Sequence, residues 1–545
     1  MRRKTSSAGE GFPLMGDASQ RPGTETRLSD PQARLAVLAK NSVANLLRMG
    51  TSWIIVLVVP PLLIRLLDRA SYATWMLVLQ IGAYATIFDG GLQLAIGRFV
   101  ARAEHAADRN YLGTVLSSST VFLGMVAAAV CVLAATVAFH LGSLFHSIPA
   151  PIVPQARAAL LLVGGSLGLA MSTSAFAGLC LGLEKNEINA AAVSVSKLAG
   201  AGGTLWAAFH HEGLMCMALW TAAGTLMQPV IFYFATRLHG AAAHFKLRLV
   251  RLAMVRQFAR FCGATFASQL SSLLISGLDL PIVAAFDFRN AGYYALAATA
   301  SNLLSVPHGA VLFTLVPMMS SRSAGEDAQR MGQALVRTSR LATALLLLAA
   351  IPFMLGMPVL LHLWVGPEYA QHALEFAEIL MGAQLVRLTL LPYCVIGFSA
   401  GEQSRMLVSP TVEAAVNVAC SLILVRFIGA EGVAVGTLVG AFVGVALHFL
   451  VSMRQTRSMA FNRAQLLWQG ILRPVAWAAV PAGALALCLH WFTDPAIQIA
   501  LLAASAAALA AVFWYGHLDA GERNVIHGAG THLLAARFRP SAIGV

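Results

Sequence analysis

Long apolar segments recur from about residue 41 to residue 516, and they constrain the fold more than any other feature of the chain. Each is about 20 residues long, the length at which an α-helix crosses the hydrocarbon core of a bilayer. Their apolar residues run continuously and do not alternate with polar ones, which favours helices over barrel strands. Only 11% of the 545 residues are charged, against about 25% in a soluble domain. The sequence therefore predicts an all-α integral membrane protein.

About 14 transmembrane helices account for these segments. The expected spans are 41–65, 71–98, 111–139, 154–182, 187–209, 213–237, 258–284, 290–320, 335–363, 371–400, 405–427, 431–453, 470–490 and 496–516.

The basic residues give these spans a direction. Of the 37 Lys and Arg residues, 29 fall in the tails and in alternate loops, and only 5 fall in the remaining loops. Because cytoplasmic loops of membrane proteins carry an excess of Lys and Arg, the richer set is expected inside. Both termini are then predicted to be cytoplasmic. A net charge of +13 thus reflects membrane orientation and not nucleic-acid binding.

The two halves of the chain repeat each other at an offset of about 219 residues. Asp68 corresponds to Asp287, and Glu212 to Glu431. Six helices per repeat predict two lobes related by a pseudo-two-fold axis along the membrane normal. The expected organisation is a disordered cytoplasmic tail (1–40), an N-terminal lobe (41–237), a basic cytoplasmic linker (238–257), a C-terminal lobe (258–455), an accessory helix pair (456–517) and a cytoplasmic tail (518–545).

Several short motifs resemble those of a known transporter family. They are PLLIRLLD (61–68), YATW (72–75), FDGGL (88–92), LWVG (363–366) and IGAEGVA (428–434). In this order and spacing, the motifs resemble the Wzx-like polysaccharide flippases of the multidrug/oligosaccharidyl-lipid/polysaccharide (MOP) superfamily. The chain departs from the usual pattern at Asp68, where the family often has Gly, and at Gly91, which follows Gly90 where the family often has Leu-Gly.

The resemblance implies a V-shaped pair of lobes that works by alternating access. Its cargo would be an undecaprenyl-pyrophosphate-linked oligosaccharide, an O-antigen or exopolysaccharide repeat unit, moved across the bacterial inner membrane. Coupling to a proton or sodium gradient is a further implication. Membrane lipids, and a polysaccharide polymerase or glycosyltransferases of the same pathway, would be its partners.

Two related transporters are the main alternatives: a cation-coupled multidrug antiporter, and a flippase for the peptidoglycan-precursor lipid. A membrane-embedded enzyme is disfavoured, because the chain has no P-loop, no H-E-x-x-H motif, no G-x-S-x-G motif and no loop long enough for a catalytic domain. No cofactor or metal site is expected.

Five basic residues are candidates for binding an anionic headgroup. A charge inside a span is costly, so Arg48, Lys197 and Arg387, which fall within spans, are expected to line a cationic cavity. Guanidinium and ammonium groups are the usual partners of phosphate oxygens. The alternative for each is an ion pair or a carbonyl contact between helices. Arg98 and Arg102 end a span on the cytoplasmic side, where they either receive the headgroup or anchor the helix.

Three acidic residues within spans, Asp89, Asp279 and Glu413, are candidates for ion coupling. A carboxylate removed from water can exchange protons nearer neutral pH than an exposed one, which suits a gradient-driven transporter. For Asp89 the alternative is local, since the side chain would cap a helix break at Gly90 and Gly91.

Overall fold

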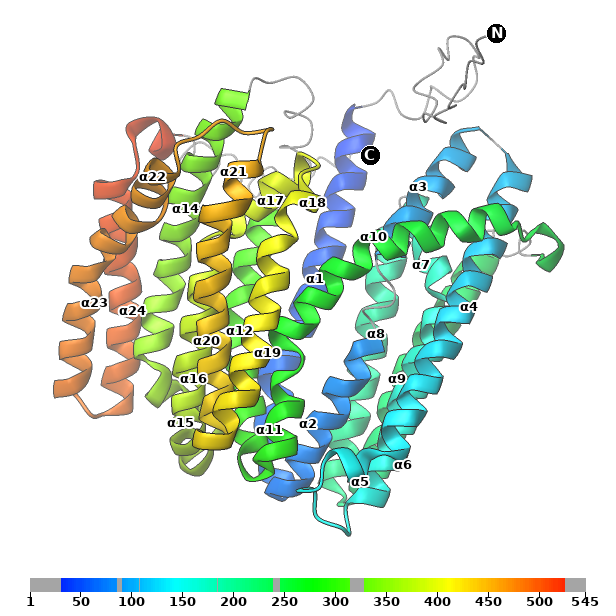
Figure 1. The fold of residues 1–545 in the computed structure, drawn as a ribbon, viewed down its shortest axis with the longest axis horizontal. Coiled ribbons are helices and arrows are strands. Elements are labelled where there is room, and N and C mark those ends of the chain that lie inside the picture. Colours follow the sequence, from blue (N-terminus) through cyan, green and yellow to red (C-terminus); the bar gives the residue numbers. More distant parts are fainter. Residues whose placement is uncertain are drawn as a thin grey trace, which may run out of the picture.

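The computed structural model describes residues 31–85, 91–106, 108–183, 185–238, 246–313 and 328–524. Within these ranges every regular element is a helix (Figure 1). The all-α membrane class is confirmed. The two tails lie largely outside the described residues, as does Asp89.

The helices of the first half form one packed group, which we call the first group. Its members are α1 (Pro31–Leu66), α2 (Arg69–Ala83), α3 (Leu92–His105), α4 (Arg109–Phe139), α5 (Leu141–Leu144), α6 (Val153–Ser172), α7 (Ser174–Gly182), α8 (Asn186–Phe209) and α9 (Gly213–Leu238).

The second group follows a short helical turn at Leu247–Leu249. Its members are α10 (Leu252–Ser276), α11 (Asp279–Phe286), α12 (Phe288–Phe313), α14 (Ala328–Leu355), α15 (Met357–Val365), α16 (Pro367–Leu388), α17 (Leu391–Ser399), α18 (Gln403–Met406), α19 (Val408–Ile428) and α20 (Ala430–Leu447).

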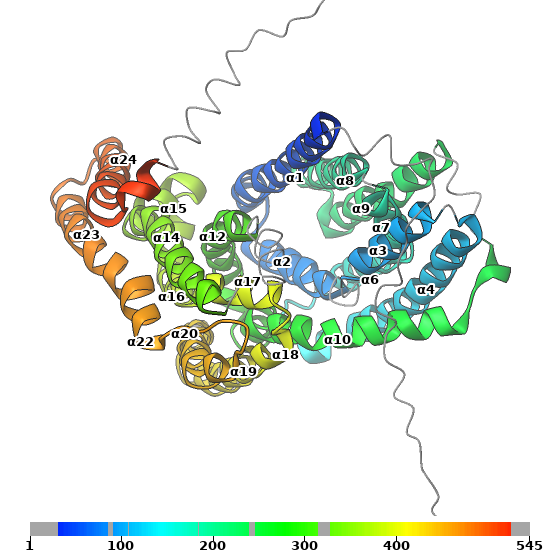
Figure 2. The ribbon, with the colours of Figure 1, turned by 90° about the horizontal axis from the view of Figure 1, so that it is seen from above.

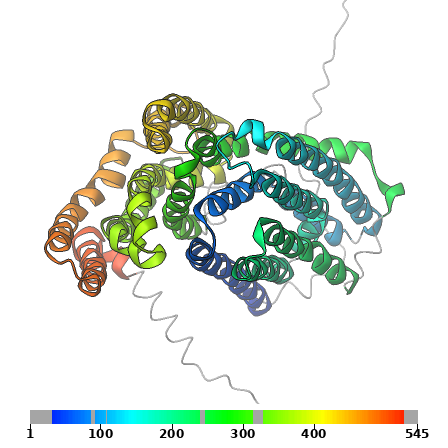
Figure 3. The ribbon, with the colours of Figure 1, turned by 90° about the horizontal axis from the view of Figure 1, so that it is seen from below.

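The last helices form an accessory pair that packs on α14. Figure 3 shows them at the edge of the molecule farthest from the first group. They are reached through π-helical and short α-helical turns: His448–Ser452, α21 (Met453–Gln455), α22 (Arg463–Gln465) and η6 (Leu466–Leu472). The pair itself is α23 (Arg473–Trp491) and α24 (Pro495–Val512), which ends in the turn Phe513–His517.

Ten helical stretches among the described residues are long and apolar enough to cross a membrane, and the pair α16–α17, bent by 41°, would make eleven. Three expected spans are not among them: 71–98 (α2 with α3), 187–209 (α8) and 290–320 (α12). Two of these run into residues that the structure does not describe, and α8 is rich in small and polar residues. The count of fourteen therefore stays a prediction.

The loops expected on one side of the membrane lie at one end of the molecule. Figure 1 shows α5, α11 and α15 at one end, which we call the α5 end. It shows α18, α22 and the start of α10 at the other, which we call the α18 end. In the predicted topology the α5 end lies on the outer side of the membrane and the α18 end on the cytoplasmic side.

Glycines allow the closest helix contacts in both groups. A Cβ atom added at Gly224 of α9 would lie 2.6 Å from the Cα atom of Gly200 in α8. In the second group, a Cβ atom at Gly436 of α20 would lie 2.7 Å from the backbone nitrogen of Ser421 in α19. Small residues at helix interfaces are typical of membrane proteins, where close packing replaces the hydrophobic effect.

Polar and aromatic side chains join the two groups at the α5 end. Arg69 Nη1 of α2 donates to the Tyr293 hydroxyl of α12 at 3.0 Å, and that hydroxyl donates to Glu368 Oε1 of α16 at 3.3 Å. The rings of Tyr72 and Tyr293 both contact Tyr369, with centroid distances of 6.0 and 4.9 Å. This contact lies within a large buried apolar cluster that contains residues of both groups.

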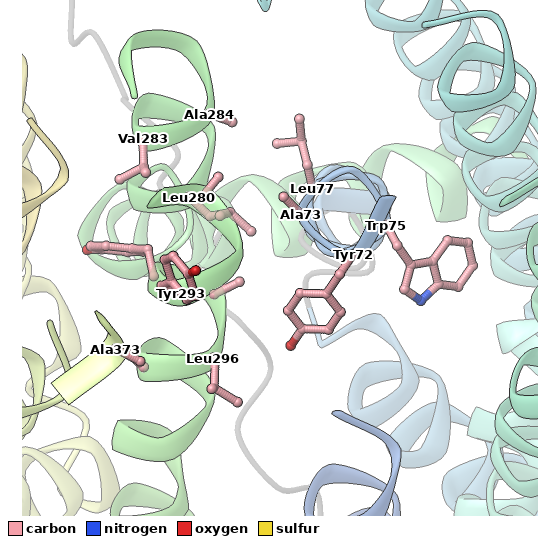
Figure 4. Close-up of a cluster of buried hydrophobic side chains, with 14 of the residues drawn as sticks. Tyr72, Ala73, Trp75, Leu77, Leu280, Val283, Ala284, Tyr293, Leu296 and Ala373 are labelled. Carbon is pink, nitrogen blue, oxygen red and sulfur yellow. The ribbon is translucent and has the colours of Figure 1, made fainter. Parts of the chain in front are cut away.

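Figure 4 shows how α2 divides its side chains between the two groups. Ala73 and Leu77 face Leu280 of α11, whereas Trp75 points the other way, toward the helices of the first group. All four side chains are buried. Helix α2 therefore forms part of the interface between the two groups and also one wall of the first group's interior.

Helix α10 forms a second interface between the two groups, at the α18 end. Figure 2 shows it running along one side of the molecule from the second group to α4. Its Phe258 is fully buried and packs edge-on against Phe99 of α3, with ring centroids 5.8 Å apart. Helix α10 of the second group is thus anchored on the first group by apolar contacts.

Candidate functional site

A cavity of about 410 Å³ lies inside the first group, between α1, α2, α6, α8 and α9. Polar side chains on three of these helices line it alongside apolar ones: Ser52 of α1; Ser196, Lys197 and Thr204 of α8; and Thr221, Thr225 and Gln228 of α9. Trp75, the side chain of α2 that points into this group, forms part of the wall. A volume of this size is in the range of small-ligand sites.

Lys197 is the charged residue in the lining of this cavity. Its Nζ atom donates to Ser52 Oγ at 3.0 Å, which ties α8 to α1. Arg48, one turn before Ser52, lies close enough to act electrostatically on Lys197. Within the described ranges neither residue forms an ion pair with a carboxylate. The structure thus brings two of the predicted cations together.

Hydroxyl groups complete the polar part of the wall. The Thr204 and Thr221 hydroxyls share a hydrogen bond of 2.9 Å. The Ser196 hydroxyl is buried and has no hydrogen-bond partner in the part of the chain that the structure describes. A buried hydroxyl without a partner is costly, and Ser196 belongs to the lining of this cavity.

Lys197 was predictable from the sequence as a charge within a span, but its polar neighbours were not predicted. A periodic signal was present, because Ser196, Gly200 and Thr204 recur every four residues on α8. On α9, Thr221, Thr225 and Gln228 follow with spacings of four and three. Residues with such spacing share one helix face.

Arg387 lies in a different place, among the helices of the second group. Its Nε atom is 2.5 Å from Glu413 Oε1 of α19, and its Nη2 atom donates to the Thr437 carbonyl of α20 at 3.3 Å. The two charged side chains are 16% and 8% exposed. The structure therefore gives Arg387 both contacts that were named as alternatives to a cavity role, an ion pair and a carbonyl.

Asp279 belongs to the same buried network. One of its oxygens accepts from the Thr437 hydroxyl at 2.9 Å and from the Tyr294 hydroxyl at 3.2 Å. Arg387 also acts on it electrostatically. This arrangement places one basic and two acidic side chains, Arg387, Asp279 and Glu413, at the meeting of α11, α16, α19 and α20.

The remaining candidates are apart from both places. Arg98 and Arg102 are exposed on α3, and the Arg98 guanidinium lies over the Phe261 ring of α10 at 5.5 Å from its centroid. Asp89 falls between α2 and α3, outside the described residues, so its prediction is not tested. Among the described residues, no cluster of His, Cys, Asp and Glu is suited to a metal ion.

A family model ties this architecture to known proteins. The model described as polysaccharide biosynthesis protein matches residues 38–323, which is more than half of the chain. The chain belongs to the polysaccharide biosynthesis protein family. No match was found among curated protein sequences.

Solved structures of the MOP superfamily share the fold of this family member. A structure of the lipid II flippase MurJ in an inward closed conformation has a TM-score of 0.68 at 15% identity, covering 87% of this chain and 99% of that one. An inward-facing multidrug resistance transporter of the MATE family has a TM-score of 0.63 at 14% identity, covering 75% and 97%. A MOP superfamily transporter from Pyrococcus furiosus has a TM-score of 0.51 at 15% identity, covering 80% and 98%.

Family and fold together confirm the resemblance seen in the sequence. This member of the polysaccharide biosynthesis protein family has the fold of those transporters.

Proposed function

We propose that this protein moves a lipid-linked oligosaccharide with an anionic diphosphate linkage across the bacterial inner membrane by alternating access. The observation that carries the proposal is the pair Lys197 and Arg48. Lys197 lines the cavity, Arg48 acts on it electrostatically, and neither has a carboxylate partner among the described residues. Two like charges that act on each other repel, and an anion between them would relieve that repulsion. The cargo phosphates are such an anion.

The polar lining supports a sugar-bearing cargo. Hydroxyl and amide side chains such as Thr221, Thr225 and Gln228 can donate to and accept from sugar hydroxyls. The undecaprenyl-pyrophosphate carrier fits this chemistry and is the carrier that the family resemblance implies. The tail of the carrier would remain in the lipid while the headgroup crosses in the cavity.

The buried network of the second group is our candidate for ion coupling. Its two carboxylates, Asp279 and Glu413, face one guanidinium, Arg387, so a proton or sodium ion would balance the charge. Binding there would change the contacts of four helices at once.

A transport assay tests the cargo site. The full-length protein is reconstituted into vesicles that contain a fluorescent diphosphate-linked oligosaccharide lipid. The appearance of this lipid in the outer leaflet is followed by its binding to a lectin added outside the vesicles. We expect Lys197→Ala to lower the rate at least about tenfold, the effect of losing one charge-assisted contact of about 1.5 kcal/mol. Lys197→Arg should retain most of the rate. Lys246→Ala is the matched control, because Lys246 is exposed before α10.

Full transport by a correctly folded Lys197→Ala protein would contradict the cargo-site proposal. Equal transport of a cargo with an uncharged linkage would contradict the anionic requirement. For coupling, transport that is indifferent to the collapse of both proton and sodium gradients would exclude Asp279 and Glu413 as ion carriers.

A further inference from the structure

A second and larger cavity, of about 740 Å³, lies at the α18 end, between α14 and the segment that leads into the accessory pair, whereas Lys197 belongs to the first group. One wall is the first three turns of α14. The opposite wall is the segment from Ala460 to Gln469, which leads into the accessory pair, and Asp519 borders the cavity after α24. None of the transport contacts described above involves these residues. The volume is in the upper part of the range for ligand pockets.

The two walls are held together by backbone contacts. The Ala460 N–H donates to the Ala328 carbonyl at 2.8 Å. A Cβ atom added at Gly332 would lie 1.9 Å from the Ala460 oxygen, so only glycine allows α14 and this segment to approach so closely. Asn462 accepts from the N–H groups of Ala464 and Gln465 and fixes the start of α22. The shape of the cavity is therefore set by the fold and not by flexible side chains alone.

Amide side chains dominate the polar lining. Gln329 and Gln333 lie four residues apart on one face of α14, and Gln465 and Gln469 lie four residues apart on the facing segment. Gln465 Nε2 donates to Gln469 Oε1 at 3.2 Å, which aligns the second pair. A carboxamide offers donors and an acceptor together. Two such pairs across a cavity match a ligand whose groups also donate and accept.

The two arginines of the lining are already paired with carboxylates. Arg340 Nη2 contacts Glu522 Oε1 at 2.5 Å and Asp519 Oδ2 at 3.2 Å, and Arg337 Nε contacts the same Glu522 oxygen at 2.7 Å. Two guanidinium groups thus face two carboxylates. A phosphate would have to displace these acids, so an uncharged ligand is favoured.

Two further features suit a hydroxyl-rich ligand. The Nε atom of Arg340 is buried and has no hydrogen-bond partner among the residues that the structure describes. Phe461 contributes an aromatic side chain to the lining, which the apolar C–H face of a sugar ring can contact. Donors, acceptors and an apolar surface are the groups that bind a pyranose.

We propose that this cavity binds a sugar-like group, uncharged and rich in hydroxyls, that is presented either free in solution or on a lipid headgroup. The site is separate from the cargo cavity and does not depend on the proposed transport function. Because it lies between α14 and the accessory pair, an occupant would join α23 and α24 more firmly to the second group.

Thermal unfolding of the full-length protein in phosphatidylcholine nanodiscs tests the proposal. The probes are methyl β-D-glucopyranoside in solution, monoglucosyl diacylglycerol in the bilayer, and phosphatidylglycerol at the same mole fraction. We expect a saturable rise of about 2 °C or more in the unfolding midpoint with at least one sugar probe. A rise with the free sugar identifies a soluble source, and a rise with the glycolipid alone identifies a lipid source.

Variants assign the rise to the cavity. Gln333→Ala and Gln469→Ala should each raise the half-saturating sugar concentration at least about tenfold. Gln498→Ala should leave it unchanged, because Gln498 lies at the start of α24, at the opposite end of the accessory pair, where its Nε2 atom donates to the Phe492 carbonyl. If an alanine variant unfolds early without ligand, Gln469→Asn, which keeps a shorter amide, replaces it and should weaken binding.

Three results would overturn the proposal. They are no rise with either sugar probe, a rise that the cavity variants share unchanged with the wild type, or a rise with phosphatidylglycerol in place of the sugars. The last result would mean that the site takes an anionic headgroup.

Discussion

The buried pair Arg387–Glu413 provides the sharpest test of the structure. Replacing Glu413 with Leu leaves the Arg387 guanidinium, 16% exposed, without the carboxylate that it contacts at 2.5 Å. Removing one partner of a buried ion pair costs about 3–5 kcal/mol, because the remaining charge is desolvated and unpaired. The Thr437 carbonyl at 3.3 Å and the nearby Asp279 stay in place. We therefore expect the lower end of that range, about 3 kcal/mol.

The double variant Arg387→Met/Glu413→Leu should recover most of this loss. Apolar residues of similar volume in place of a buried ion pair are often neutral or stabilising. The free energies of unfolding of the wild type, both single variants and the double variant, from SDS titrations in mixed micelles, give the coupling energy. Arg256→Met, which removes an exposed guanidinium from α10, is the control and should change stability by about 0.5 kcal/mol or less.

Additive single effects, with a coupling energy below about 0.5 kcal/mol, would refute the pairing. The same double variant also separates two roles of Arg387. Transport at the wild-type rate would assign Arg387 to packing, and loss of transport from a stable double variant would assign it to coupling or cargo binding.

Two further predictions concern packing and pH. Gly436→Ala should destabilise the protein by about 1–3 kcal/mol, because its Cβ atom would meet the Ser421 backbone nitrogen at 2.7 Å. The control Gly483→Ala, with no atom within 4 Å of the new Cβ, should be neutral or stabilising. Equal effects of the two substitutions on thermal unfolding would contradict this prediction. Burial alone would raise the pKa of Glu402 between α17 and α18, but N–H donors from the segment that starts at Arg457, together with a nearby guanidinium, hold it below its usual value. Glu402 therefore stabilises the fold above pH of about 4.5, its ordinary pKa, and this contribution is lost as the pH falls through the lowered value. Glu402→Gln should lower the midpoint of unfolding at pH 7 and flatten its decline in acid, and an unchanged acid profile would exclude this role.

The fold class was predictable because lipid restricts the chain so severely. A continuous apolar run of about 20 residues has few alternatives to a helix once the backbone must satisfy its own hydrogen bonds. Helix boundaries are predicted poorly where a helix is broken within the membrane. The run 371–400 contains a 41° bend between α16 and α17, and the run 154–182 is divided at Thr173, which lies between α6 and α7. Hydropathy averages over such breaks.

The partners of the charged residues were not predictable from one sequence. Lys197 and Ser52 are 145 positions apart, and Arg387 and Glu413 are 26 apart on helices separated by α17 and α18. The sequence showed that each charge in a span needs a partner or a cavity. The choice between them depends on how helices rotate and cross, which small residues such as Gly200 and Gly224 decide.

The two helical groups satisfy their buried charges in opposite ways, and this difference bears on mechanism. Lys197 and Arg48 have no carboxylate partner among the described residues, whereas Arg387 faces both Glu413 and Asp279. In the proposed cycle, an anionic cargo would complete the first group and a cation would complete the second. A ligand shifts a conformational equilibrium only by its difference in affinity between the states. The two groups contact each other through α2, α11 and α12. Each binding event can therefore change this shared interface without any contact between cargo and ion.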